Sequence, residues 1–541
     1  MTILRPLPRP AARFLSALVL VAWVVQMGAL ARRAWSSTTV ALAADLARYG
    51  SSAQWRGIYY RGDKIGFSVG QTTPTESGFE VREDARLQMM VLGSTASVRL
   101  TTRANVDPAF ALQRFSFALD AGTGATEVDG TLQGRLLHLS IRTPSGGERR
   151  ETRELAEAPA LSLNLPRTLA ARGLKPGETL QVSVFDPATL TNVPMTLEVK
   201  AREVVRAAGR PVPAFRVEGR AAGITTRSWI TDVGEMVREE SPMGLIVVRE
   251  TRDQAQALAV PGAIQTDLIE AAAIAPVTPK RIDDPATVTR LQVRIDGLSG
   301  FDPADLEGAG QSASGGTIEV RDARGLRPGP DPGDLASFLR PEAFLESDAP
   351  EVRAEALKAA GDAAAPRLRA ERLVRHVHAI LEKRPTVGIP SAVEVLKTRI
   401  GDCNEHTALY VAMARSLGLP SRIAVGLVYL RGAFYYHAWA EVWIEESKGR
   451  GVWLPVDPTL NQFPADATHV RLTRGGLERQ AAIAGLIGHT RLEILDVQLR
   501  PGSNPVLVGR AASDLRPLDL PLPRRDGAGR GCWSSPAGGR P

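Results

Sequence analysis

One cysteine stands where a helix is expected to begin. Asp402 and Glu405 have the spacing of a capping box, and Gly418 followed by Pro420 is typical of a helix end. The pattern predicts a helix over 403–417 with Cys403 as its first residue. Unpaired backbone N–H groups and the positive end of the helix dipole favour a thiolate at that position. Cys403 is therefore the candidate nucleophile.

A histidine and an aspartate follow on two predicted strands. The runs YYHAWAEVWI (435–444) and VWLPVDPTL (452–460) flank the polar loop 445–451. His437 and Asp457 are symmetric about that loop, so an antiparallel hairpin brings them opposite each other, to within about a residue or two. A carboxylate can orient the imidazole, and the imidazole can take the thiol proton. Together with Cys403 they form a predicted Cys-His-Asp triad, with the Cys403 backbone N–H as one oxyanion donor.

Other interpretations of the same residues remain open. Cys403 can be a plain buried cysteine, and Cys403, His406, His437 and Asp457 are acceptable zinc ligands by type. Hydrolytic zinc sites seldom use this mixture, so we expect neither a metal nor a cofactor. The other cysteine, Cys532, can pair with Cys403 on paper. Two cysteines exclude a disulfide framework and a four-cysteine metal site.

Three stretches around these residues resemble the motifs of the transglutaminase-like superfamily, which has the papain-type α+β fold. They are GDCNEHTALYVAMARSLGLPSRIAVGL (401–427), YYHAWAEVWI (435–444) and WLPVDPT (453–459). The preceding PSAVEVLKTRIGDC (390–403) is similar to the way bacterial members enter the nucleophile helix. The resemblance implies that Cys403 is the nucleophile, His437 the base and Asp457 its orienting partner.

The function that the resemblance implies is acyl transfer or hydrolysis on amide bonds of a protein or peptide, including cell-envelope peptides. A lysine amine attacking the thioester gives a cross-link and water gives hydrolysis, and the sequence does not choose between them. The alternative is a non-catalytic envelope scaffold that works through its β region. The net charge is +7, but the arginines are scattered, so no nucleic-acid partner is expected.

An apolar run near the N-terminus predicts export. Residues 14–31 are apolar and are flanked by arginines on both sides. As a helix they span roughly 27 Å, enough to cross a hydrocarbon core. We expect a membrane anchor within residues 1–34 and a body in the periplasm or extracytoplasmic space. The small residues Ala29 and Ala31 leave a cleaved signal peptide, and hence a secreted protein, as the alternative.

The remaining pattern predicts a multidomain fold class: an N-terminal transmembrane helix, an antiparallel all-β region and an α+β transglutaminase-like domain. Short alternating runs separated by turn residues predict the β domain over 50–255. Further predicted segments are a linker or small β subdomain over 256–345, the α+β domain over 346–500, and a disordered Pro/Gly/Arg tail over 501–541.

Overall fold

The structure is a computed structural model of the chain. It describes residues 53–501, apart from residues 92–93, 123, 222–223, 258–266, 268–271, 278–280, 387, 477–478, 480–482 and 484–489.

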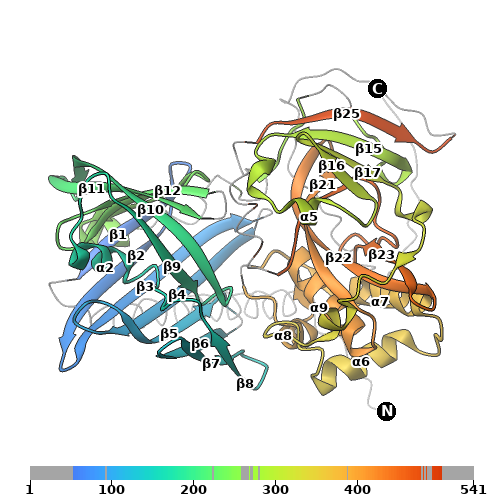
Figure 1. Ribbon diagram of the computed structural model, residues 1–541, viewed down its shortest axis with the longest axis horizontal. Helices are drawn as coiled ribbons and strands as arrows, with labels where there is room; N and C mark the ends of the chain where they lie inside the picture. The colour runs from blue at the N-terminus through green and yellow to red at the C-terminus, as the bar shows by residue number, and fades with distance from the viewer. Residues whose placement is uncertain are drawn as a thin grey trace, which may run out of the picture.

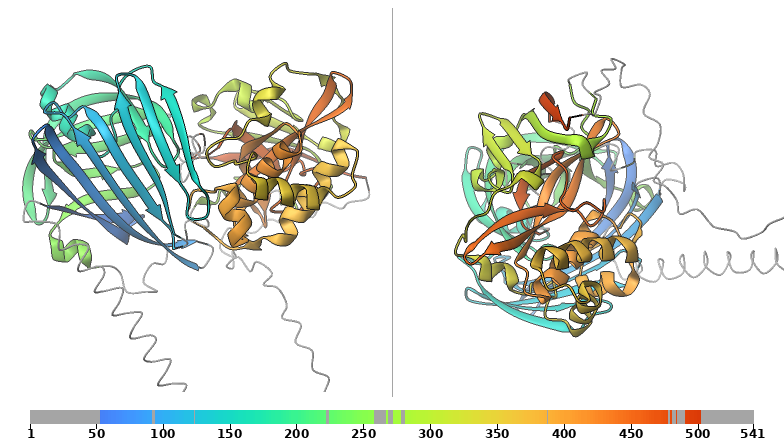
Figure 2. Two further views of the ribbon diagram at one scale, coloured as in Figure 1. Left: turned by 90° about the horizontal axis from the view of Figure 1, so that it is seen from below. Right: turned by 90° about the vertical axis from the view of Figure 1, so that its right-hand side faces the viewer.

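The first half of the described chain forms a 14-stranded antiparallel sheet with the order β8-β7-β6-β5-β4-β3-β2-β1-β14-β13-β12-β11-β10-β9. Figure 2 shows that this sheet curls, so that β9–β14 lie behind β1–β8. Its strands are β1 (Gln54–Tyr60), β2 (Asp63–Thr75), β3 (Gly78–Val91), β4 (Ser94–Val106), β5 (Leu112–Asp120), β6 (Ala125–Gln133), β7 (Leu136–Arg142), β8 (Glu148–Glu154), β9 (Thr179–Asp186), β10 (Thr191–Ala207), β11 (Arg210–Ala221), β12 (Ile224–Ile230), β13 (Met236–Glu240) and β14 (Leu245–Glu250).

Local chemistry explains these hairpins. In β7 the burial alternates from residue to residue, with Leu137, Leu139 and Ile141 inside, as expected for a strand with one covered face. The β10–β11 turn places both Ala208 and Gly209 at positive φ, which is the geometry of a tight two-residue hairpin turn. Helix α2 (Leu165–Arg172) packs over β9–β12, and α3 (Arg252–Gln256) follows β14.

The second half combines a four-stranded sheet, a five-stranded sheet and the short parallel pair β19-β20 with helices that pack against them (Figure 1). One sheet has the order β16-β17-β15-β25 and the other the order β18-β23-β22-β21-β24. The strands are β15 (Val288–Ile295), β16 (Gln311–Ser314), β17 (Thr317–Arg321), β18 (Gly329–Pro330), β21 (Ser421–Leu430), β22 (Ala433–Ser447), β23 (Arg450–Val456), β24 (His469–Arg474) and β25 (Leu492–Leu499). The helices are α6 (Pro350–Ala360), α7 (Pro366–Ile380), α8 (Ala392–Thr398) and α9 (Cys403–Ser416). The shorter elements are β19 (Glu382–Lys383), β20 (Ile400–Gly401), α5 (Pro303–Leu306), η1 (Pro285–Thr287), η2 (Leu298–Gly300), η3 (Ala323–Gly325) and η4 (Leu335–Leu339).

Helix α9 lies at the centre of the second half. Nearly every residue from Glu405 to Ser416 is buried, because α9 packs between the five-stranded sheet and helices α6, α7 and α8. One continuous apolar core joins these helices to both smaller sheets. A second core is shared between the two halves: Leu137 and Phe115 of the large sheet pack in the same cluster as Ala343 and Ile389.

The fold class predicted from the sequence is corrected by this structure. Strands make up 51% and helices 19% of the described residues, so the chain is mainly β around one large antiparallel sheet. The sequence pattern understated the strands because several pair across long distances: Val293 of β15 pairs with Ile494 of β25. Short strands with distant partners carry little local signal.

The predicted N-terminal transmembrane helix finds no support. Among the described residues no helix is long and apolar enough to cross a membrane. Residues 14–31, on which that prediction rests, lie outside the described residues, as do residues 502–541 of the predicted tail and Cys532.

Candidate active site

Helix α9 begins at Cys403 because the residues before it form a capping box. The Asp402 carboxylate accepts a hydrogen bond from the Asn404 backbone N–H (2.9 Å), and the Glu405 carboxylate accepts one from the Asp402 backbone N–H (2.9 Å). Gly401 makes room for this arrangement, since a Cβ there would lie 2.2 Å from the Glu405 Cβ. The helix start read from the sequence is therefore the observed one.

Cys403 is a free, partly buried thiol on the side of α9 that faces β22. Burial, and next the negative charge of Asp402, raise its pKa well above the ordinary value, and a backbone hydrogen bond from Ala438 only partly opposes this. The sequence argument expected the helix dipole to favour a thiolate. The structure reverses that expectation, because burial disfavours the thiolate and the negative charges of Asp402 and Glu405 act in the same direction. The resting sulfur is thus a thiol that needs a base.

The β22–β23 hairpin brings His437 and Asp457 into contact. Trp443 pairs with Trp453 and Ala440 with Val456, so Asp457 follows directly after β23, near the level of His437. The His437 Nε2 lies 2.7 Å from the Asp457 Oδ2. Asp457 contacts the Nε2 of His437, so the other ring nitrogen, Nδ1, is the one that could exchange a proton with another group.

Asp457 is completely buried and accepts four hydrogen bonds. Its Oδ1 receives the backbone N–H groups of Thr459 (2.7 Å) and Leu460 (2.9 Å), while its Oδ2 receives His437 and also the Nε2 of His469 (3.1 Å). Burial alone would raise the pKa of Asp457, but the two histidines outweigh it and hold that pKa well below its usual range. Asp457 is therefore a fixed carboxylate anion.

His469 is the site residue that the sequence reasoning missed. It opens β24, and its Nδ1 lies 3.1 Å from the backbone oxygen of Asp466 and 3.3 Å from its Oδ1. Burial would lower its pKa, but the carboxylates of Asp457 and Asp466 raise it to about 10. His469 is thus an imidazolium at neutral pH. Its only sequence signal is the short stretch Asp466–His469, in which Asp466 also accepts from the Thr468 backbone N–H (2.9 Å).

His406, one of the two histidines in the zinc alternative, contacts the backbone at the start of α9. His406 is fully buried, with its Nδ1 2.7 Å from the Asp402 carbonyl oxygen, and burial lowers its pKa to about 4. Within the described part of the chain, the ligand-type atoms that cluster are those of His437, Asp457 and His469, which lie within 4.8 Å of one another. Both imidazoles direct Nε2 at the same carboxylate oxygen, so the contacts within this cluster are hydrogen bonds to Asp457.

A buried charge cluster fixes the strand that carries His437. Glu441 lies on the same face of β22 and is fully buried between three arginines. It accepts from the Nε of Arg422 (2.8 Å) and of Arg474 (3.1 Å) and forms a very short contact with Arg471. Burial would raise the pKa of Glu441, but these arginines, Arg471 first, hold it well below the usual range. The cluster ties β21, β22 and β24 together beside the site.

Aromatic packing surrounds the same histidines. Trp439 is 1% exposed; its ring centroid lies 6.2 Å from that of His437 in a nearly parallel orientation and 5.2 Å from that of His469. Trp443 and Trp453 pack edge to face at 5.8 Å. Trp439 and Trp443 are therefore packing residues, and Trp439 packs against both histidines.

Comparisons with known proteins match separate parts of the chain. Residues 57–250 match a family described as a protein of unknown function, DUF3108. Uncharacterized proteins of Mycobacterium bovis and Mycobacterium tuberculosis are 33% identical over 91 residues, which is 15% of this chain and 29% of theirs. The chain thus spans less than a third of the length of these relatives.

Three solved structures are similar to parts of the chain at low identity. A candidate cysteine protease from Cytophaga hutchinsonii is 19% identical, with 42% of this chain and 86% of that one covered and a TM-score of 0.26. The periplasmic domain of TgpA from Pseudomonas aeruginosa is 22% identical, with 27% and 56% covered and a TM-score of 0.21. A β-barrel-like protein of DUF1849 from Brucella abortus is 13% identical, with 37% and 95% covered and a TM-score of 0.29.

The second half of the chain gives the clearest match. Residues 354–458 match the model of the transglutaminase-like superfamily, and this span contains Cys403, His437 and Asp457. Together with the helix start at Cys403 and the His437–Asp457 contact, the match identifies residues 354–458 as a transglutaminase-like core domain.

Proposed function

We propose that the transglutaminase-like domain is a thiol acyl-transfer enzyme in which Cys403 attacks an amide carbonyl, His437 moves the proton and Asp457 orients His437. The observation that carries the proposal is the buried 2.7 Å contact between His437 Nε2 and Asp457 Oδ2 beside the first turn of α9. A carboxylate bound to one imidazole nitrogen fixes the ring and its tautomer, so that the other nitrogen can act as a base.

The raised pKa of Cys403 determines the order of events. The thiol proton passes to the Nδ1 of His437 as the sulfur attacks the carbonyl carbon, and a tetrahedral oxyanion forms. The Cys403 backbone N–H, at the first position of α9, is the proposed donor to that oxyanion. When the C–N bond breaks, His437 returns the proton to the leaving amine and a thioester remains on Cys403.

Two outcomes are open to the thioester, and both use the same residues. A primary amine that attacks it gives a new amide, which is cross-linking, whereas water gives a carboxylic acid, which is hydrolysis. In either case His437 takes a proton from the attacking group and returns it to the Cys403 sulfur. We propose protein or peptide amides as the substrate class.

The assay offers the purified full chain a glutamine-containing peptide together with a labelled primary amine. Mass spectrometry of the peptide separates amine incorporation from conversion to glutamate or backbone cleavage. We expect one of these products from the wild-type chain and none from Cys403→Ala. If the wild-type chain gives none of them with a broad peptide mixture, or if Cys403→Ala gives the same product, the proposal fails.

A second candidate function is a non-catalytic scaffold, and the raised pKa of Cys403 favours it, because a protonated, partly buried thiol is poorly reactive. The two candidates differ in how His437→Ala changes Cys403. Alkylation of Cys403 by iodoacetamide should slow markedly in His437→Ala if His437 accepts the thiol proton. An unchanged alkylation rate supports the scaffold.

We further propose that the body of the chain works outside the cytoplasm. The proposal rests on the apolar residues 14–31 and the arginines that flank them. An alkaline phosphatase fused after residue 541 should be active, and an inactive fusion in a chain that is stably expressed would contradict export.

A further inference from the structure

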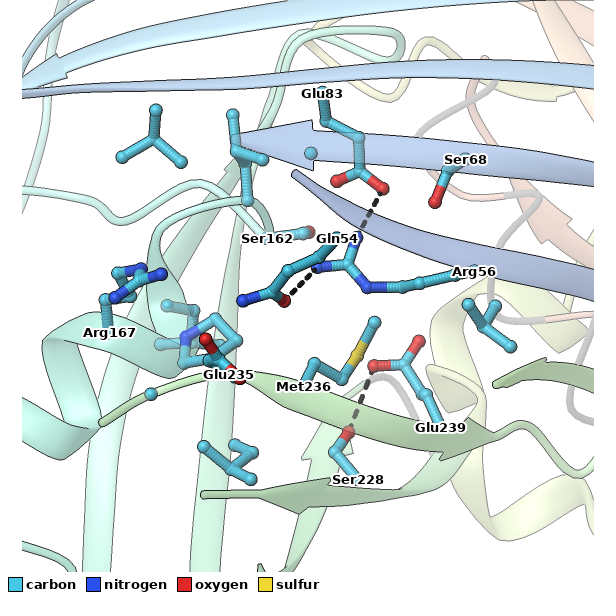
Figure 3. Close-up of a pocket in the computed structure, with 18 of the residues that line it drawn as sticks. Gln54, Arg56, Ser68, Glu83, Ser162, Arg167, Ser228, Glu235, Met236 and Glu239 are labelled. Atoms are coloured by element: carbon cyan, nitrogen blue, oxygen red, sulfur yellow. Dashed lines mark hydrogen bonds and ion pairs between the residues drawn. The ribbon is translucent and has the colours of Figure 1, made fainter. Parts of the chain in front are cut away.

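The curled sheet of the first half encloses a cavity of about 560 Å³. Its walls come from β1–β3 on one side, from β9–β14 on the other, and from α2 with the residues before it (Figure 3). At about 30 Å³ per water molecule the space equals roughly 19 waters. That volume lies within the range of about 300–1,000 Å³ typical of small-molecule sites.

The interior of this sheet is polar where a packed core would be apolar. Gln54 and Arg56 of β1 line the cavity, whereas Trp55 between them packs with Phe67 and Val69 on the opposite face, next to α3. Alternate residues of a strand point to opposite faces, so the first residues of β1 turn Gln54 and Arg56 inward and Trp55 outward, while Ile58 adds an apolar side chain further along the wall. Buried charge lowers stability unless it is paired or meets a ligand. This reversal indicates a binding cavity rather than a failure of packing.

The inward polar groups are held in place but are not all satisfied. The Nη1 of Arg56 lies 3.0 Å from the Glu83 carboxylate, and its Nη2 lies 3.4 Å from the Gln54 side-chain oxygen (Figure 3). Among the described residues, no hydrogen-bond partner is found for the Nε of Arg56 or for the hydroxyl of Ser68, a residue that is only 2% exposed. Native proteins rarely leave buried polar groups unpaired, so these two point to a ligand.

The facing wall is apolar. Under α2, the side chains that line the cavity are Leu169, Met195, Leu197, Val217 and Ile230. All of them belong to one apolar cluster, which also fixes α2 on the sheet. The cavity therefore offers one apolar wall and one polar wall, which matches an amphipathic molecule.

Most of the charged side chains at the polar wall pair with one another or with a neighbouring side chain. Arg56 pairs with Glu83 (3.0 Å), and Glu235 pairs with Arg249 (2.8 Å), which lies behind it. Glu239 accepts the Ser228 hydroxyl (3.0 Å), and burial raises its pKa, which favours its neutral form.

Arg167, in the first turn of α2, donates to the Val233 carbonyl oxygen (3.2 Å) and has no carboxylate within 4.0 Å among the described residues. The remaining cavity-lining arginine, Arg82, lies 3.6 Å from Asp84. Burial lowers the pKa of Arg167 and the charge of Glu235 only partly opposes this, while the ion pair of Glu235 is with Arg249. An anionic group next to Arg167 would therefore stabilise the charged guanidinium.

We propose that this cavity binds one amphipathic molecule with an acyl-type apolar chain and a single anionic head, the chain against Met195, Leu197 and Val217 and the head at Arg167. The site is separate from Cys403 and His437, so the proposal stands whether or not the transglutaminase-like domain is catalytic.

Isothermal titration of the purified full chain with dodecanoate tests the proposal, with dodecyltrimethylammonium as a probe of equal chain length and opposite charge. We expect saturable one-site binding of dodecanoate and at least about 10-fold weaker binding of the cation. Arg167→Ala should weaken dodecanoate binding by roughly 10-fold to 100-fold, the loss typical of a hydrogen bond to a charged group. Arg150→Ala is the matched control, because Arg150 is 77% exposed on the edge strand β8.

A second variant tests the apolar wall. Val217→Phe should fill part of the cavity and reduce dodecanoate binding, with thermal unfolding and circular dichroism used to check that the variant folds. If it does not fold, Arg167→Ala decides the matter alone. The proposal is overturned if dodecanoate shows no saturable binding, if both probes bind equally, or if Arg167→Ala binds dodecanoate like the wild-type chain.

Discussion

Replacing His469 with glutamine removes a buried positive charge while keeping a side-chain N–H donor. The His469 Nε2 lies 3.1 Å from the Asp457 carboxylate and its Nδ1 lies 3.3 Å from that of Asp466. Although burial opposes it, these two carboxylates raise the pKa of His469 from 6.5 to about 10. At 1.36 kcal/mol per pKa unit, the shift corresponds to roughly 5 kcal/mol of stability that depends on the charge.

The sign of the pH dependence follows from the direction of the shift. Because the pKa of His469 is higher in the folded than in the unfolded chain, its stabilisation is complete below about pH 6.5 and is lost as the pH rises through about 10. His469→Gln should therefore be less stable than the wild-type chain by several kcal/mol at pH 6. The difference should shrink steadily between pH 7 and pH 10.

Urea unfolding at pH 6, 8 and 10, followed by tryptophan fluorescence, measures this difference. His138→Gln is the control, because His138 lies on β7, far along the chain from the site, and its Nδ1 contacts the uncharged Thr152 hydroxyl (3.0 Å). A difference between His469→Gln and the wild-type chain that stays constant from pH 6 to pH 10 would refute the assignment of His469 as a buried imidazolium.

The remaining predictions concern the capping box, the charge cluster and the orienting carboxylate. Gly401→Ala should lower the free energy of unfolding by roughly 1–2 kcal/mol, because a Cβ there displaces the Glu405 cap. Gly325→Ala is the control and should change little, since no described atom lies within 4 Å of its added Cβ. Equal unfolding midpoints for the two variants would contradict this prediction. Glu441→Gln should lower the free energy of unfolding, measured by chemical denaturation, by roughly 3–5 kcal/mol, since three arginines then lose their buried counter-charge. A decrease below about 1 kcal/mol would show that charge does not stabilise the cluster. Asp457→Asn should reduce the rate of product formation by roughly 10⁴-fold, because the amide favours the tautomer of His437 that cannot accept the thiol proton. The Cys403 thiol should remain titratable. An unchanged rate would remove Asp457 from the proposed triad.

The parts of the site that follow from local patterns could be predicted from the sequence. The capping box of Asp402 and Glu405 fixed the start of α9 at Cys403, because both partners lie within one helical turn. The hairpin spacing placed His437 beside Asp457, because a tight hairpin determines the register of its own strands.

The features that depend on distant or buried neighbours could not be predicted in this way. The chain between Asp457 and His469 folds back so that His469 contacts both Asp457 and Asp466. The spacing of residues in the sequence does not indicate such a contact. The pKa of Cys403 follows from burial and the charge of Asp402, which a helix-dipole argument alone does not include. In the sequence, the start of β1 shows only an alternation of polar and apolar residues. Which of its two faces lines the cavity follows from the curvature of the sheet.

The most direct test of the central claim is to trap the acyl-enzyme on Cys403. The full chain is mixed with an acyl-amide substrate that it turns over, quenched in acid within the first turnovers, digested and analysed by mass spectrometry. We predict an acyl adduct on the peptide that contains Cys403 in the wild-type chain, and loss of that adduct in His437→Ala, because the amide leaving group needs a proton from His437. An adduct on another residue, or equal adduct formation in His437→Ala, would contradict the proposed roles of Cys403 and His437.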